Sequence, residues 1–232
     1  MEIPPGKVSD KGTNSHRLLL FVVAFLTLWQ PALGQDVEAQ KRAADQILRL
    51  PPGAFPELPT NVVQDLHKRG CTVPQSSLNP KPQNVLHGEF AQRGQNDWVI
   101  LCSKNKSTSS LGWDVRPPGI PREATVWTST ILVYFGGSTA NVAEIDEALD
   151  FYEMLGIDRF VNGWPVITGY NYSRILRSAD KSYIEEHIRA YGEPDVKYPP
   201  IDHEGIEDPI LDKASRIHYF YQGKWLVLPG AD

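Results

Sequence analysis

The chain lacks the features that mark several common functional classes. Its 23 Lys and Arg residues are outnumbered by 28 Asp and Glu residues, which gives a formal net charge of -5 at pH 7. A chain without a basic excess does not attract a phosphate backbone, so we expect no nucleic-acid partner. The sequence contains no H-E-x-x-H, G-x-S-x-G, Walker A or G-x-G-x-x-G motif. These absences lower the expectation of an enzyme without excluding one, and they give no reason to expect a cofactor.

Long apolar runs are also missing. The run Leu18–Leu28 is shorter than the roughly 17–25 residues that a membrane-spanning helix needs. A basic segment precedes it, with Lys7, Lys11, His16 and Arg17. The small-x-small sequence Ala32-Leu33-Gly34 that follows is typical of a signal-peptide cleavage site. We therefore predict a signal peptide over 1–34, a mature domain over 35–232, and a secreted or periplasmic protein with no stable membrane span after cleavage. A retained membrane anchor is the alternative.

Cysteine is scarce, because the chain has only Cys71 and Cys102. In an oxidising compartment such a pair is expected to form a disulfide. The loop between them would gain roughly 3.5 kcal/mol of stability from closure. Two buried thiols that never meet are the alternative. Neither cysteine has a C-x-x-C partner or a metal-type spacing, so we expect no zinc site or thiol chemistry.

The spacing of apolar residues predicts the secondary structure of the mature chain. It predicts helices over 36–50, 60–70, 141–156 and 178–191. It predicts strands over 84–91, 97–103, 131–135, 166–172, 216–221 and 224–228. We therefore predict a single α+β domain with an antiparallel sheet of about four to six strands. Two main helices, which begin near Asn141 and Ser178, are expected to pack on one face of this sheet.

The apolar residues of segment 103–130 follow neither the spacing of a helix nor the alternation of a strand. The segment has Ser/Thr runs at both ends, prolines in the middle, and two tryptophans, Trp113 and Trp127. Irregular loops longer than about 12–15 residues are uncommon in compact domains. We interpret the segment as a surface insertion whose tryptophans pack against the domain. The alternative is a loop in which Trp113 and Trp127 bind a ligand such as a sugar or a peptide.

Ionisable residues on the two predicted main helices receive structural interpretations. The acidic face of helix 141–156 is expected to be solvated and to do no chemistry. It comprises Asp146, Glu147, Asp150 and Glu153. His187 lies on the apolar face of helix 178–191 and is interpreted as a core histidine rather than a ligand.

The hairpin over 84–103 resembles one blade motif of the FG-GAP or VCBS type in the spacing of Phe90, Gly94 and Asp97. Calcium loops of that type carry acidic or Asn side chains where this chain has Ala91-Gln92-Arg93. A hard cation needs several oxygen ligands, so we predict no calcium and no other metal site. The motif occurs once, which excludes a propeller.

The densest ionisable cluster is Asp202-His203-Glu204, within the acidic segment 202–208. These three residues are the candidate catalytic set of a small hydrolase or a metal-assisted enzyme. Adjacent residues of an extended segment point to opposite sides, so the two acids cannot both orient the imidazole. We favour a histidine that anchors the loop. The pair Asp208-Pro209 is typical of a helix start and predicts a short helix over 210–214.

Five short sequences stand out when the chain is taken as a whole. They are Arg69-Gly70-Cys71-Thr72-Val73-Pro74-Gln75, Asp97-Trp98-Val99-Ile100-Leu101-Cys102-Ser103, Asp202-His203-Glu204-Gly205-Ile206, Gly223-Lys224-Trp225 and Gly230-Ala231-Asp232. With the signal peptide, they resemble a group of small exported bacterial proteins that have no assigned function. The resemblance implies no activity and no catalytic residue. The leading hypothesis is an exported, non-enzymatic module that binds an envelope protein or a small ligand, and the enzyme described above is the alternative.

Overall fold

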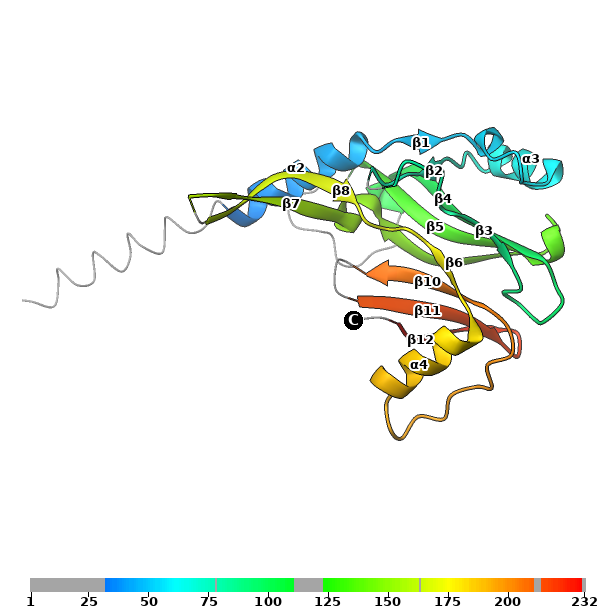
Figure 1. The fold of residues 1–232 in the computed structure, drawn as a ribbon. Helices are drawn as coiled ribbons and strands as arrows, with labels where there is room; N and C mark the ends of the chain where they lie inside the picture. Colours follow the sequence, from blue (N-terminus) through cyan, green and yellow to red (C-terminus); the bar gives the residue numbers. More distant parts are fainter. Residues whose placement is uncertain (1–31, 78, 111–122, 163, 211–213, 231–232) are drawn as a thin grey trace, which may run out of the picture.

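A four-stranded antiparallel sheet lies at the centre of the protein, in the strand order β3-β4-β5-β6 (Figure 1). The computed structural model describes residues 32–77, 79–110, 123–162, 164–210 and 214–230. The central strands are β3 (Val85–Gly88), β4 (Asp97–Ser107), β5 (Thr125–Tyr134) and β6 (Val142–Leu149). Strands β4 and β5 pair over ten residues and are the two inner strands of this sheet.

The central sheet is covered on both faces. Val99 and Leu101 of β4 belong to one hydrophobic core, and Ile100 and Cys102 belong to another. Successive strand residues point to opposite faces, so a strand that is apolar on both faces serves two cores. The second core is covered by helix α3 (Thr60–Lys68), which lies on the outer face of the sheet in Figure 1.

A second four-stranded antiparallel sheet packs beside the first, in the order β12-β11-β10-β9. Its strands are β9 (Arg177–Ala179), β10 (Gly205–Ile210), β11 (Ala214–Tyr221) and β12 (Lys224–Pro229). Helix α4 (Lys181–Tyr191) covers its outer face (Figure 1) and buries Ile184 against Ile217 in a third core. Between the two sheets lie Ile206 and the polar groups described below.

The remaining elements surround the central sheet. Helix α2 (Ala32–Asp45) lies along the hairpin of β7 (Met154–Val161) and β8 (Trp164–Tyr172) (Figure 1). Strands β1 (Arg49–Leu50) and β2 (Val73–Pro74) form a short pair. The 3-10 turns are η1 (Pro52–Ala54), η2 (Thr108–Ser110), η3 (Phe135–Gly137) and η4 (Asp150–Glu153).

The predicted disulfide between Cys71 and Cys102 is confirmed, with the two Cα atoms 5.1 Å apart. It joins Cys71, three residues after the end of α3, to the middle of β4. Gly70 ends the helix with φ at 68°, a left-handed conformation that favours glycine. The backbone groups of Thr72 and Ser103 pair directly beside the disulfide. The outer helix is thus held to the central sheet by both covalent and hydrogen bonds.

The α+β class and both predicted hairpins are confirmed. The terminal hairpin turns at Gln222-Gly223, whose φ angles of 51° and 79° are those of a tight two-residue turn. Helix α4 is also confirmed, and the Asp180 carboxylate caps it by accepting a hydrogen bond from the backbone N–H of Tyr183. These elements are determined by local sequence.

The helix predicted over 141–156 is wrong. This segment forms β6, the 3-10 turn η4 and the start of β7. Its apolar spacing fits a helix, but β6 forms backbone hydrogen bonds with β5, and this pairing outweighs local propensity. Its acidic residues are not a solvated face, because Asp150 is 0% exposed and Glu153 is 9% exposed. The two predicted helices therefore do not share a face, and α2, α3 and α4 cover different parts of the molecule.

Three boundaries also differ from the sequence predictions. The pair Asp208-Pro209 lies in β10 and starts no helix. Because β9 pairs only with Gly205–Glu207, the missing N–H of Pro209 breaks no bond on that side. The predicted helix over 36–50 is α2, which ends at Asp45. Within 103–130, β4 continues to Ser107 and β5 begins at Thr125, and residues 111–122, with Trp113, lie outside the described residues.

Candidate functional site

The residues Asp202, His203 and Glu204 have separate structural tasks. Both ring nitrogens of His203 lie 2.9 Å from carbonyl oxygens, those of Glu204 and Phe220, and the ring stacks on Tyr219. The side chain of Asp202 is 69% exposed. A carbonyl oxygen only accepts hydrogen bonds, so the imidazole is directed at two acceptors and has no nitrogen left for a substrate.

Glu204 joins the two sheets. Its carboxylate accepts hydrogen bonds of 2.8 Å from the backbone N–H of Glu89 and from the Ser178 hydroxyl. An added Cβ at Gly88 would lie 2.1 Å from Glu204 Oε2, so any other residue here would displace the carboxylate from this position. The Glu204 carboxylate is thus already used in hydrogen bonds that link the two sheets.

The structure places the two candidate binding tryptophans differently. Trp113 lies outside the described residues. Trp127 is part of β5, and its ring lies under the guanidinium of Arg49, 3.8 Å from the ring centre. Trp127 therefore does not lie in an exposed loop, and its ring contacts Arg49 of the same chain.

Asp97 of the hairpin that resembles a calcium loop is buried and has four donors. They are the backbone N–H groups of Phe90, Ala91 and Gly136 and the amide of Gln95. A carboxylate that already accepts four hydrogen bonds holds the turn together by itself. Its oxygens are directed at these donors rather than toward a cation site.

A buried ionic network lies between the two sheets. The Arg174 guanidinium is 0% exposed and donates two bonds of 2.9 Å to Asp208 and one of 2.8 Å to Asp146. Arg216 contacts the same two carboxylates. Burial alone would raise the pKa of Asp208, but His218, 3.6 Å away, and Arg174 outweigh it and hold that pKa well below its usual range.

The carboxylates and imidazole of this network are the one group in the described residues that could converge on a metal ion. Asp146, Asp208 and His218 have ligand atoms within 4.8 Å of one another. Arg174 and Arg216 direct their guanidinium groups at the same carboxylate oxygens. These two positive charges already neutralise the acids and would repel a cation, so the network fits an ion-paired tether between the sheets better than a metal site.

A second ionic cluster fixes the chain that follows α2. Arg49 lies 2.7 Å from the buried Asp150, which also accepts a 2.7 Å hydrogen bond from the Ser103 hydroxyl. Arg49 donates as well to the carbonyl oxygens of Ala44 and Ile47, at 3.0 and 3.2 Å. Carbonyls at the end of a helix have no partner within the helix, so the guanidinium both caps α2 and holds residues 44–47 in place.

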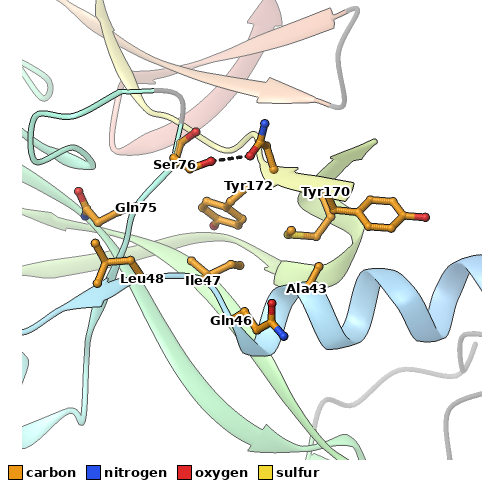
Figure 2. A pocket seen from close by; sticks show the side chains of 11 residues that line it. Ala43, Gln46, Ile47, Leu48, Gln75, Ser76, Tyr170 and Tyr172 are labelled. Atoms are coloured by element: carbon orange, nitrogen blue, oxygen red, sulfur yellow. Dashed lines mark hydrogen bonds between the residues drawn. The ribbon is translucent and has the colours of Figure 1, made fainter. Parts of the chain in front are cut away.

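Residues 46–48 form one wall of a cleft of about 310 Å³ (Figure 2). The other walls come from the loop 75–77, from the start of β7 and from the end of β8. The cleft is lined by Ala43, Gln46, Ile47, Leu48, Gln75, Ser76, Ser77, Met154, Tyr170, Asn171 and Tyr172. Its volume is at the lower end of the range of ligand pockets, roughly 300–1,000 Å³.

Hydrogen bonds hold the walls of the cleft in place. The Gln75 amide donates to three carbonyl oxygens and accepts from the backbone N–H of Gln83, which fixes the loop 75–77. Ser77 bonds to Asn171 across the cleft, as the dashed line in Figure 2 marks. Tyr172 is 2% exposed, and its hydroxyl lies 3.1 Å from that of Ser129. The cleft is therefore preformed.

A buried acid lies directly beside the cleft. Glu153 precedes the lining residue Met154, and its Oε2 atom has no hydrogen-bond partner in the described part of the chain. Burial raises the pKa of Glu153 to about 7. At lower pH the carboxyl is neutral, so this position puts little charge near the cleft.

Sequence reasoning did not find this site. Its lining comes from four separate parts of the chain, 43–48, 75–77, Met154 and 170–172, and none of them has a motif. The sequence holds one signal of the cluster beside the cleft. Arg49 lies between two leucines, and an arginine among apolar residues often pairs with a buried acid.

No family model, no curated protein and no solved structure matches this chain. Among the described residues, no helix is both long and apolar enough to cross a membrane.

Proposed function

We propose that this protein is an exported, non-enzymatic binding module that holds a small ligand in the cleft between α2 and β8. The single observation that carries this proposal is the preformed cleft of about 310 Å³, with walls fixed by Arg49, Gln75 and the Ser77–Asn171 contact. A pocket whose walls are already in place binds without the entropic cost of ordering them.

Export is supported by the chain's covalent chemistry and its N-terminal sequence. The Cys71–Cys102 disulfide is of the kind that persists in oxidising compartments. The basic segment, apolar run and small-x-small sequence before residue 35 are those of a secretory signal. We propose that the mature protein is secreted or periplasmic, as in the group of exported bacterial proteins that it resembles.

Binding without catalysis is supported by the residues at the two candidate sites. The nitrogens of His203 are directed at backbone carbonyls, and Glu204 is held by the contact between the sheets. The cleft contains the hydroxyls of Ser76 and Ser77, but none of its described lining residues is a histidine or an acid that could activate them. A hydroxyl nucleophile needs an adjacent base, so the hydrolase alternative has less support.

The proposal is tested by NMR on the exported, purified, ¹⁵N-labelled protein with a library of small fragments. We expect binding fragments to shift the amide signals of Ile47, Ser77 and Asn171 together. Tyr170→Ala should weaken these fragments at least about tenfold, because it removes part of the lining. Tyr191→Ala is the matched control, since Tyr191 is an exposed tyrosine on α4. A library that leaves the cleft signals unmoved would contradict the proposal.

A further inference from the structure

Among the residues that the structure describes, no charged side chain lines the cleft. None of its eleven lining residues is Asp, Glu, Lys, Arg or His. The nearby ions are engaged elsewhere: Arg49 pairs with Asp150 and stacks on Trp127, and its side chain is only 6% exposed. Glu153 is buried and does not line the cleft. A ligand that carried a full charge would lose water here without gaining a counter-ion, which is costly.

The lining combines apolar and polar side chains, with Leu48 and Gln46 exposed and Tyr172 and Met154 buried. Tyr172, Met154 and Ile47 supply the apolar surface, and Figure 2 shows Tyr172 facing Ile47 across the cleft. At the rim, the Gln46 side chain is exposed and its amide makes no hydrogen bond with the described residues. Its carbonyl accepts and its NH₂ group donates, so it can bind either kind of neutral polar group.

We infer that the ligand is an uncharged amphipathic small molecule. Its flat or apolar body packs over Tyr172, Met154 and Ile47, and a neutral hydrogen-bonding group, such as a carboxamide or a hydroxyl, reaches Gln46. This inference rests on the proposed binding function and specifies the ligand class of that cleft. The selectivity comes from rejecting charged ligands as much as from attracting neutral ones, because the described lining residues carry no charge of either sign.

Three probes of nearly equal shape separate charge from size: benzamide, which is neutral, benzoate, which is an anion, and benzamidine, which is a cation. NMR titration at pH 6, below the pKa of about 7 at Glu153, follows the amide signals of Ile47, Ser77 and Asn171. We expect benzamide to bind with millimolar affinity, and both charged probes to bind at least about tenfold more weakly. A charged probe that equals or exceeds benzamide at these signals overturns the inference, and so does benzamide that leaves them unmoved.

A variant provides the reciprocal test. Gln46→Lys places one positive charge at the rim of the cleft and removes the amide that binds the neutral group, so benzamide should weaken and the ratio of benzoate to benzamide affinity should rise at least about tenfold. Val227→Lys, at an exposed position on β12, is the control and should leave all three probes unchanged. If Gln46→Lys does not favour benzoate, the probes bind elsewhere and the inference fails.

The two proposals fail in different ways. If library fragments bind the cleft whatever their charge, the proposed binding function stands and the proposed ligand class is wrong. A cleft that no fragment of any charge occupies rejects both.

Discussion

The guanidinium of Arg174 binds the carboxylate of Asp208 through two parallel hydrogen bonds of 2.9 Å, and both side chains are 0% exposed. Arg174 follows β8 of the two-stranded β7–β8 sheet, and Asp208 lies in β10, so the pair joins the chain after this hairpin to the second sheet. The same guanidinium donates to the Ser129 carbonyl oxygen in β5, at 3.0 Å. With its bond to Asp146 in β6, this one side chain satisfies acceptors on three strands.

Arg174→Met should lower the free energy of unfolding by about 3–5 kcal/mol, because it leaves Asp208 buried without its partner. Urea denaturation measures the loss. The double variant Arg174→Met with Asp208→Leu should recover part of it, since no charge is then stranded. Arg177→Met is the control: its side chain is 67% exposed, and the change should stay within about 0.5 kcal/mol. Equal losses for the two arginines would show that the network does not stabilise the fold.

Glu153→Gln should remove a pH dependence of stability. Burial raises the folded-state pKa of Glu153 from 4.5 to about 7. Between these values the folded state keeps a proton that the unfolded state has lost, so stability falls as the pH rises and is lowest above pH 7. The variant should match the wild type at pH 4 and exceed it by about 3 kcal/mol at pH 8.

The measurement for Glu153 is urea denaturation at pH 4 and pH 8. Glu185→Gln on the exposed side of α4 serves as the control, and its pH dependence should equal that of the wild type. A Glu153→Gln protein that loses as much stability as the wild type between these pH values would show that the carboxyl ionises normally.

Gly88→Ala should cost about 1–3 kcal/mol, because the new methyl group would overlap the Glu204 carboxylate. Thermal or urea denaturation gives the value. Gly53→Ala, with no atom within 4 Å of the added carbon, should have almost no effect. In a Glu204→Ala background the cost at Gly88 should largely vanish. A cost that persists there would mean that the backbone of β3, and not the carboxylate, requires glycine.

The elements that the sequence predicts correctly are those that local chemistry determines. The Gln222-Gly223 turn has residues that accept positive φ, and the Asp180 cap begins α4. Both signals lie within a few residues of the element that they define. The disulfide was predictable for a different reason, because only two cysteines are present.

The parts that the sequence does not reveal depend on long-range pairing. Val142, Ile145 and Leu149 are spaced as on a helix, yet they lie in β6 because β5 offers a strand to pair with. The burial of Asp150 follows from Arg49, which is 101 positions away. The cleft likewise exists only after four separate parts of the chain meet. No periodicity carries that information.

The two-faced burial of β4 has a consequence for how its register is chosen. In most sheets a slip by one residue moves apolar side chains into water, and this penalty selects the correct pairing. Here such a slip would only exchange one apolar core for the other, so hydrophobicity discriminates weakly between the alternatives. Two adjacent residues make the distinction instead. Cys102 must face Cys71 on one side, and Ser103 must reach Asp150 on the other, and only one alignment of β4 satisfies both.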